Sequence, residues 1–296
     1  MQTSLSGGGT GRDRGAGVRL VAALVVSFLL CASGVGEASP AALEFPFQLR
    51  GGLIWIEVQT PASAEPLNFM VDSGAQASVI NLGVARRLRL KLGEPVSVQG
   101  VESKAGGFWP EHLRARAGDV VLPKDYLAVD LGALSRACGC GVDGLLGADF
   151  FKGRRVQIDF RDRKIRLLNS PPAAANAASI PLETRPSGML VEIQVNNNPL
   201  QKVRLDTGCA SPLQWTAGKD AGGPCSEQIA VGVAAVSMPL ITTTVHLGGN
   251  EFNAVPTGLH VNPIFPGEAG LLGAPLLSRF GRVTVDGVAG RLFLQK

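Results

Sequence analysis

A short pattern that occurs twice constrains this chain more than any other feature. One apolar run ends in Asp72–Gly74 (Asp-Ser-Gly), and a second apolar run ends in Asp206–Gly208 (Asp-Thr-Gly). A carboxylate at the end of a buried strand costs free energy unless it is paired or hydrogen-bonded. Two such carboxylates, each followed by a hydroxyl residue and a glycine, predict that each is the partner of the other.

The segments around the two triplets also repeat in the same order. Gly270–Ala274 matches Gly144–Ala148 almost letter for letter, and the hairpin pattern of residues 153–168 recurs at 281–294. The spacing between the two copies is much longer than the repeat of a solenoid, which is about 20–50 residues. It therefore indicates one internal duplication. The strands are short and helices are few. We therefore predict an all-β fold with two homologous, closed β-barrel-like lobes and a few short helices.

The N-terminal segment has the order of a secretory signal. Three arginines precede the apolar stretch Leu20–Cys31, and small residues follow it. We predict a signal peptide over residues 1–38 and an exported protein, periplasmic or secreted. The alternative is an uncleaved membrane anchor, but the apolar stretch is shorter than the roughly 20 residues of a spanning helix. We expect no membrane span in the mature protein.

The mature chain divides at a segment without periodicity. Residues 170–179 are rich in alanine, proline and serine and are typical of a linker. The chain of 296 residues is long enough for two domains of ordinary size. We therefore predict an N-terminal lobe over residues 39–169 and a C-terminal lobe over residues 180–296.

Composition and scattered motifs exclude several other classes of function. The net charge of +4 is spread along the chain without a basic block, which argues against nucleic-acid binding. Residues 139–144 fit the spacing of a dinucleotide loop, but no long helix follows them. The single Cys-x-Cys at 138–140 has no nearby histidine, and His112, His246 and His260 are scattered as surface or core polar groups. We expect neither a cofactor nor a metal.

The doubled motifs together resemble the aspartic peptidases of the pepsin and retropepsin kind. The resemblance rests on Asp72–Ala75 with Leu145–Gly147 and on Asp206–Gly208 with Leu271–Gly273. It is greatest for bacterial, exported members with two lobes in one chain. The resemblance implies an aspartic endopeptidase in which Asp72 and Asp206, one from each lobe, share a proton and activate a water.

The resemblance also assigns roles to the residues around the two aspartates. Ser73 and Thr207 are expected to hydrogen-bond across the lobe interface, and Gly74 and Gly208 to let the backbone approach the carboxylates closely. The Leu-Leu-Gly segments are expected to support the loops from behind. A polypeptide substrate would lie extended in a cleft between the lobes, under a hairpin formed by Val101–Trp109.

Some residues depart from the pattern of this family. Cys209 stands where a small residue usually follows the glycine, and the only tyrosine, Tyr126, lies beyond the expected hairpin. Without residues 1–38 four cysteines remain, and an even number in an exported protein predicts a Cys209–Cys225 disulfide. Asp159 and Asp286 occupy matching positions and are expected to form turns.

Two alternatives stay open at this point. The altered second loop is compatible with a catalytically inactive, protease-like protein that binds a peptide or a partner. Single-lobe units could also pair between two chains, whereas we expect a monomer with both aspartates in one chain.

Overall fold

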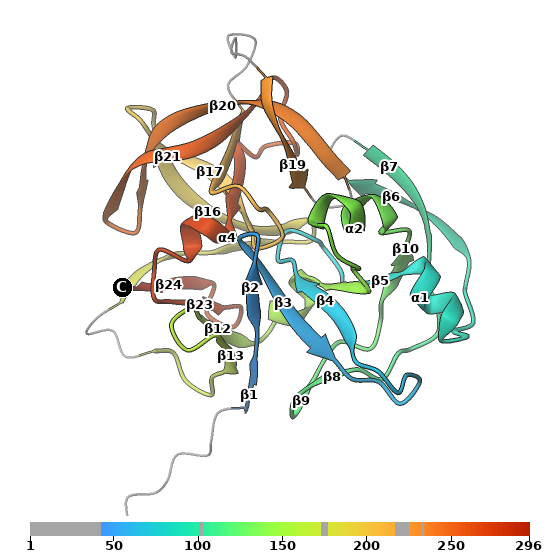
Figure 1. Cartoon of the computed structure of the whole chain (residues 1–296). Coiled ribbons are helices and arrows are strands. Elements are labelled where there is room, and N and C mark those ends of the chain that lie inside the picture. Colours follow the sequence, from blue (N-terminus) through green and yellow to red (C-terminus); the bar gives the residue numbers. More distant parts are fainter. Residues whose placement is uncertain (1–42, 101–102, 173–176, 217–224, 232–233) are drawn as a thin grey trace, which may run out of the picture. The chain divides into compact units, whose positions relative to one another are not determined.

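The computed structural model describes residues 43–100, 103–172, 177–216, 225–231 and 234–296. These residues lie in one compact unit, Ala41–Lys296, which consists mainly of β-strands with four short helices (Figure 1). The predicted all-β fold is therefore confirmed. The predicted signal peptide, residues 1–38, lies outside the described residues. Within the described ranges no helix is both long enough and apolar enough to cross a membrane.

The first half of the chain builds an eight-stranded sheet in the order β2-β3-β4-β11-β5-β10-β7-β6. Its strands are β2 (Gln48–Arg50), β3 (Leu53–Val58), β4 (Leu67–Val71), β5 (Val79–Asn81), β6 (Pro95–Gly100), β7 (Ser103–Phe108), β10 (Leu127–Val129) and β11 (Gly144–Leu146). The same half contains α1 (Leu82–Arg87), α2 (Gly132–Cys138), α3 (Ala148–Phe151) and a small ribbon of β8 (Arg116–Ala117) and β9 (Val120–Val121). Most neighbouring strands of this sheet are antiparallel, and two pairs, β4–β11 and β5–β10, are parallel.

The second half repeats this sheet strand for strand, in the order β15-β16-β17-β22-β18-β21-β20-β19. Its strands are β15 (Glu183–Arg185), β16 (Gly188–Val195), β17 (Gln201–Asp206), β18 (Leu213–Thr216), β19 (Cys225–Val231), β20 (Ala234–Leu247), β21 (Asn250–His260) and β22 (Gly270–Gly273), and α4 (Ala274–Leu277) follows β22. The parallel pairs recur as β17–β22 and β18–β21. β16 also pairs with β20, which closes this sheet on itself. The predicted duplication is thus present in the topology.

A third sheet contains strands from both halves of the chain. Its six strands are β1 (Leu43–Pro46), β13 (Lys164–Leu167), β12 (Arg155–Asp159), β23 (Arg282–Asp286), β24 (Arg291–Gln295) and β14 (Ala178–Pro181), in that order. The sequence predicted that each repeated hairpin would belong to its own closed lobe. Instead, the two hairpins pair with each other through β12 and β23. This pairing satisfies the backbone groups of two strand edges that would otherwise be exposed. β14 begins inside the predicted linker.

Two aspartates tie the shared sheet together in a symmetric way. Asp159 Oδ1 accepts the N–H groups of the following turn, as does Asp286 Oδ1, so their predicted role as turn formers is confirmed. Each also makes an ion pair across the β12–β23 junction. Arg282 Nε lies 2.6 Å from Asp159 Oδ2, and Arg155 Nε lies 2.9 Å from Asp286 Oδ2. The repeat therefore joins its two copies through reciprocal charge pairs.

The two lobes differ in the apolar layer beside their Asp loops. In the first lobe this layer is a broad cluster that includes Trp55, Met70 and Leu145. In the second lobe the described members of this layer include Cys209, Met238 and Leu271, so a thiol lies beside the second Asp loop.

Candidate active site

Each of the two predicted catalytic aspartates stands where a strand ends beside its parallel neighbour. The Asp72 N–H, directly after β4, donates to the Leu146 carbonyl oxygen at the end of β11 (2.9 Å). Asp206 is the last residue of β17 and lies in register with Gly273 of β22. Because two paired strands hold each backbone, the position of each carboxyl group is set by the sheet rather than by a mobile loop.

The hydroxyl residues of the two triplets bind each other's loops across the lobe interface. Ser73 Oγ donates to the Leu205 carbonyl oxygen, and Thr207 Oγ1 donates to the Val71 carbonyl oxygen (both 2.8 Å). In return, the Ser73 N–H donates to Thr207 Oγ1 (2.9 Å) and the Thr207 N–H donates to Ser73 Oγ (3.0 Å). All four bonds are buried, so each loop can hold its position only while the other loop is in place.

The two glycines allow each loop to approach the opposite carboxyl group. A Cβ atom on Gly74 would lie 2.4 Å from the Asp206 Cγ atom, and a Cβ atom on Gly208 would lie 2.4 Å from the Asp72 Cγ atom. Such distances are far below van der Waals contact, so any side chain at either position would displace the carboxyl group. Glycine is required here for space rather than for a positive φ.

The two carboxyl groups meet and hydrogen-bond to each other. They are nearly inaccessible, with Asp72 3% exposed and Asp206 6% exposed. Asp72 Oδ1 accepts the N–H groups of both Gly74 and Ala75 (3.0 Å each). Asp206 Oδ1 accepts the Gly208 N–H (2.9 Å). The backbone therefore stabilises a negative charge better on Asp72 than on Asp206.

This environment raises the pKa of both aspartates. Burial is the main cause for Asp206, and the negative charge of Asp72 adds to it, so the Asp206 pKa lies well above its ordinary value. Burial also raises the pKa of Asp72, but the Ala75 N–H, the hydrogen bond with Asp206 and the Gly74 N–H partly offset it. The pair therefore retains a proton at pH values where an isolated aspartate has lost it, and the geometry favours Asp206 as its carrier.

The Leu-Leu-Gly segments pack directly behind the Asp loops. Leu146 and Leu272 are fully buried. A Cβ atom on Gly147 would lie 2.4 Å from the Ala77 carbonyl carbon, and one on Gly273 would lie 1.9 Å from the Ser211 carbonyl oxygen. These segments support the loops by close backbone packing.

The predicted disulfide between Cys209 and Cys225 is wrong, because Cys209 is a free cysteine. Its side chain is fully buried and points toward the interior of the lobe, where Sγ lies 3.2 Å from Ser211 Oγ. Burial, with the nearby charge of Asp206, raises the pKa of the Cys209 thiol to about 12. The thiol therefore stays protonated and acts as a packing group.

Cys209 begins a chain of buried polar groups that the sequence did not reveal. Gln214 Nε2 donates to Ser211 Oγ (3.1 Å), and Gln214 Oε1 lies 2.9 Å from His260 Nε2. All of these side chains are buried. His260 is thus the core polar group that the sequence allowed. The sequence alone does not connect it to the second Asp loop, because Cys209 and Ser211 lie in that loop, Gln214 on β18 and His260 on β21.

Val101–Trp109, the stretch expected to form a covering hairpin, supplies only the second strand of one. The hairpin is formed by β6 and β7, which pair from Pro95–Phe108 to Gly100–Ser103, so it begins at Pro95. Its tip, residues 101–102, lies outside the described residues. Trp109 directly follows β7 and is 45% exposed. Tyr126 is not part of the hairpin, because its ring is buried edge-on against Phe69. The only tyrosine of the sequence is therefore a core residue outside this hairpin.

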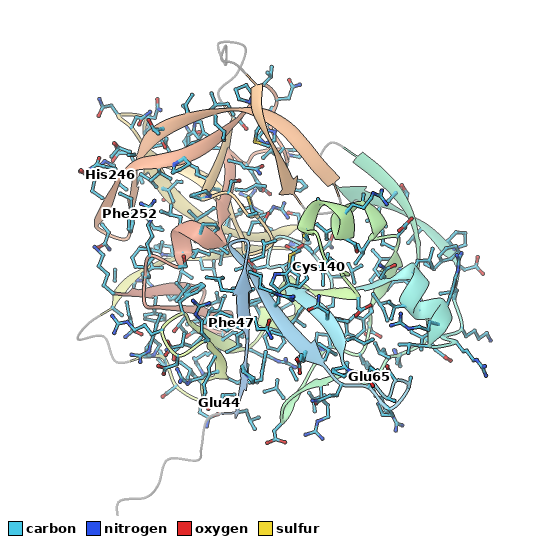
Figure 2. The ribbon with its side chains drawn as sticks, viewed as in Figure 1. Glu44, Phe47, Glu65, Cys140, His246 and Phe252 are labelled. Carbon is cyan, nitrogen blue, oxygen red and sulfur yellow. The ribbon has the colours of Figure 1, made fainter. Side chains whose placement is uncertain are left out.

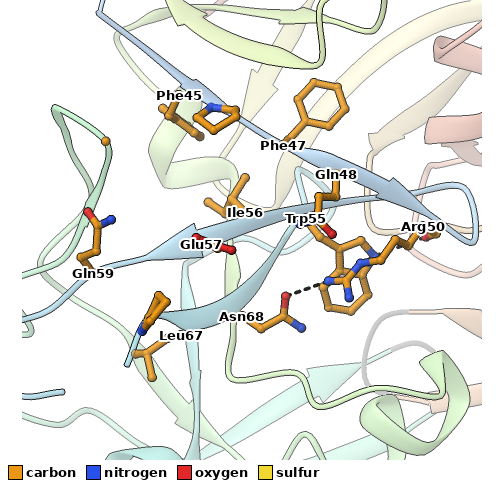
Figure 3. A pocket seen from close by; sticks show the side chains of 13 residues that line it. Phe45, Phe47, Gln48, Arg50, Trp55, Ile56, Glu57, Gln59, Leu67 and Asn68 are labelled. Carbon is orange, nitrogen blue, oxygen red and sulfur yellow. Dashed lines mark hydrogen bonds between the residues drawn. The ribbon is translucent and has the colours of Figure 1, made fainter. Parts of the chain in front are cut away.

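Other polar features lie apart from the Asp loops. A pocket of about 410 Å³ opens beside β2 and β3, and none of its lining residues belongs to either Asp loop. In this pocket Arg50 donates to Asn68 Oδ1 (2.8 Å) and lies over the Trp55 ring (Figure 3).

Two further cysteines, Cys138 and Cys140, are free and half-buried, and Cys140 is labelled in Figure 2. In the part of the chain described here, no group of three or more metal-ligating side chains occurs.

Two β-rich lobes of the same topology each contribute an Asp-Ser/Thr-Gly loop to their junction. Residues 62–150 match the family of aspartyl proteases. The structure is similar to an aspartic proteinase from Irpex lacteus (TM-score 0.58, 14% identity, covering 86% of this chain and 97% of that chain). It is also similar to basic 7S globulin from soybean (TM-score 0.53, 13% identity, covering 86% and 94%). No curated protein matches the sequence.

The chain thus has the two-lobed, pepsin-like fold of these structures. The expected two-lobed architecture is confirmed by the structural likeness, and the family match falls in the first lobe.

Proposed function

We propose that this protein is an aspartic endopeptidase that hydrolyses peptide bonds with a water activated by Asp72 and Asp206. The observation that carries the proposal is the buried, hydrogen-bonded pair of carboxyl groups, each of which has a raised pKa. Two carboxyl groups in contact cannot both ionise easily, so the pair holds one proton over a wide pH range. Such a pair contains an acid and a base at the same time.

The surroundings of the pair suggest which aspartate takes which role. Asp72, with its two backbone N–H donors, is the base that accepts a proton from the attacking water. Asp206, whose pKa is raised more strongly, is the acid that donates its proton to the carbonyl oxygen of the scissile bond. The water oxygen then bonds to the carbonyl carbon. In the second step the C–N bond breaks, the amine takes up the proton held by Asp72, and one hydroxyl of the tetrahedral carbon returns its proton to Asp206 as the carboxylic acid product forms.

A polypeptide substrate fits this chemistry. We propose that it binds between the lobes as an extended strand, held through its main chain, with the β6–β7 hairpin beside it. We also propose that the protein is exported and is periplasmic or secreted, because residues 1–38 have the basic, apolar and small-residue order of a signal peptide. The protein is proposed to act as a monomer, because one chain supplies both aspartates.

The alternative is a protease-like protein that binds a peptide or a partner without cleaving it. Cys209 in the second loop is the feature that favours it. The geometry of that loop weakens this alternative, because Asp206 accepts the Gly208 N–H, the Thr207 N–H donates to Ser73 Oγ across the lobes, and the Cys209 side chain is buried against Ser211.

The decisive experiment measures cleavage of a diverse peptide library across pH by the wild type and by Asp72→Asn and Asp206→Asn. Each substitution should lower kcat/KM by roughly 10³-fold or more, and the double variant should lose no more than a single one, because the pair acts as a unit. Asp119→Asn is the matched control, since Asp119 is an exposed carboxylate that pairs with Arg116. Near-wild-type cleavage by either folded variant would refute the assignment. A folded wild type that cleaves nothing would support the binding protein.

A further inference from the structure

One residue breaks the symmetry between the two Asp-bearing strands. Met70 and Arg204 both stand two positions before an aspartate, so each lies on the same face of its strand as that aspartate. Met70 is fully buried in the apolar cluster of the first lobe. Arg204 is also buried, with 2% of its surface exposed. An arginine is almost never buried to this extent unless its charge is paired.

The partner of Arg204 is an equally buried glutamate. Arg204 Nε donates to Glu268 Oε2 (2.8 Å) and Nη2 donates to Glu268 Oε1 (2.6 Å), which is the two-point pairing of a guanidinium with a carboxylate. The guanidinium carbon also lies 3.8 Å from the centre of the Phe265 ring. The guanidinium is therefore held along one edge by Glu268 and on one face by the Phe265 ring, and these contacts fix its orientation.

The remaining edge of the guanidinium reaches the first lobe. Arg204 Nη1 donates to the Ser187 carbonyl oxygen (2.5 Å) and to the Gly74 carbonyl oxygen (3.0 Å). Gly74 follows Ser73 in the first Asp loop, and its α-carbon faces the Asp206 carboxyl group. Arg204 thus connects the strand of the second aspartate to the loop of the first. Met70 offers no such bond in the opposite direction.

The charge of Arg204 acts on the carboxyl pair as well. It lowers the pKa of both Asp72 and Asp206 and so opposes the effect of their burial. The described ionisable groups that bear on the pair are the two aspartates themselves, Arg204 and the protonated thiol of Cys209. Glu268 holds the Arg204 guanidinium in place through two hydrogen bonds.

We propose that Arg204, oriented by Glu268, is a positioning residue for the Asp72–Asp206 pair. It holds the Gly74 peptide from the opposite lobe, and it supplies the buried positive charge that lets the pair keep one carboxylate ionised at acidic pH. This inference rests on the proposed peptidase function for its kinetic consequences, but its structural part concerns the ionisation of the pair alone.

The test compares three variants with the wild type. Arg204→Met introduces the residue that the first repeat has at this position and removes the charge. Arg204→Met combined with Glu268→Gln avoids an unpaired buried carboxylate and keeps the test available if the single variant does not fold. Arg204→Lys keeps the charge but loses the planar, multi-point contact. Circular dichroism establishes the fold of each variant.

Two readouts separate charge from positioning. In the Met variants both limbs of the pH profile of kcat/KM should move upward by roughly one pH unit, because loss of a nearby cation raises the pKa of both carboxyls. In Arg204→Lys the limbs should stay within a few tenths of a unit of wild type while kcat falls. Arg155→Met is the control, since it breaks a different ion pair between the two halves, that with Asp286, and should leave the profile unchanged.

A direct titration makes the test independent of catalysis. The NMR signals of ¹³Cγ-labelled aspartates, assigned with Asp72→Asn and Asp206→Asn, report the ionisation of the pair even in a protein that cleaves nothing. An upward shift of the apparent pKa values in the folded Met variants supports the inference. Unchanged apparent pKa values in those variants overturn it, whether or not the wild type is a peptidase. An inactive wild type with shifted values in the variants refutes only the proposed function.

Discussion

At the scale of single residues, two loops of nearly identical sequence place their aspartates in different surroundings. Asp72 accepts two backbone N–H groups, from Gly74 and Ala75, whereas Asp206 accepts one, from Gly208. Where the first loop has Ala75, the second has the buried thiol of Cys209. These small differences make the surroundings of the two coupled carboxyl groups unequal, and they lead to two predictions.

The first concerns the pH dependence of stability. The folded-state pKa of both aspartates is raised above the unfolded value, so their contribution to folding is fully present below the unfolded pKa and declines as pH rises through the folded values. Asp206→Asn removes one of the two ionisable groups. At pH 7 its free energy of unfolding should exceed that of the wild type, by about 1.4 kcal/mol for each unit of pKa elevation.

The measurement is thermal unfolding of both proteins from pH 3 to pH 8. The advantage of Asp206→Asn should shrink as pH falls toward 3, where the wild-type pair is also neutral. Asp119→Asn should follow the wild type throughout. A constant loss of stability in Asp206→Asn at every pH would contradict the prediction.

The second prediction concerns the thiols. Cys209 is fully buried and its pKa is raised to about 12, so it should resist alkylation in the native protein. Iodoacetamide at pH 8 should modify the half-buried Cys138 and Cys140 before Cys209, and denaturant should make all three equally reactive. Peptide mapping by mass spectrometry gives the order. Recovery of Cys209 in a disulfide-linked peptide from the unreduced protein would show that the buried-thiol assignment fails.

At the scale of elements, the β12–β23 pair joins the two copies of the repeat. Its register sets Arg155 opposite Asp286 and Asp159 opposite Arg282, so the two ion pairs are related by the internal symmetry. Burial opposes the ionisation of Asp159, but hydrogen bonds from Arg282, from the Asp162 N–H and from Arg166 outweigh it and lower its pKa to about 2. The junction therefore depends on a charged aspartate.

Replacing that aspartate should weaken the junction in a pH-dependent way. Because the folded pKa of Asp159 is lowered, its contribution to stability is present above the unfolded value near 4 and is lost as pH falls through about 2. Asp159→Asn should reduce the free energy of unfolding by about 2 kcal/mol at pH 7. Urea denaturation at pH 7 and at low pH measures the difference.

The matched control lies in the same turn. Asp162 also pairs with Arg166 but is 50% exposed, so Asp162→Asn should cost less than about 0.5 kcal/mol. Equal losses for the two variants at pH 7 would mean that the β12–β23 junction does not depend on the buried charge.

At the scale of the whole molecule, the lobes are joined in several independent ways. They share a six-stranded sheet, the Ser73 and Thr207 bonds cross between the Asp loops, and Arg204 bonds to the Gly74 carbonyl oxygen. Elements linked so closely should unfold together. We therefore predict that the two lobes unfold in a single cooperative transition.

Two buried tryptophans in different lobes can test this. Trp55 lies on β3 in the first lobe and Trp215 on β18 in the second. Two variants are needed, one that keeps only Trp55 and one that keeps only Trp215, with phenylalanine in place of Trp109 in both. In each variant the urea midpoint from fluorescence should equal the midpoint from far-ultraviolet circular dichroism. Separate midpoints in either variant would show that the lobes unfold independently.

The sequence by itself determined the repeated features of this protein. The Asp-Ser/Thr-Gly triplets, the Leu-Leu-Gly segments and the paired hairpins could be predicted because each depends on local requirements: a turn at a strand end, a position without a Cβ atom, an alternating apolar strand. Their recurrence in the same order was enough to predict two β-rich lobes and to place Asp72 opposite Asp206.

The tertiary structure alone decided how the two copies meet and where they differ. The shared sheet, the free state of Cys209, its hydrogen-bonded chain to His260 and the bond from Arg204 to Gly74 join residues that are far apart in the sequence or lie on unrelated elements. No periodicity connects such residues. Whether a cysteine is bridged or an arginine is buried depends on the groups that the assembled lobes bring within contact distance, and this follows only from the packing of the complete chain.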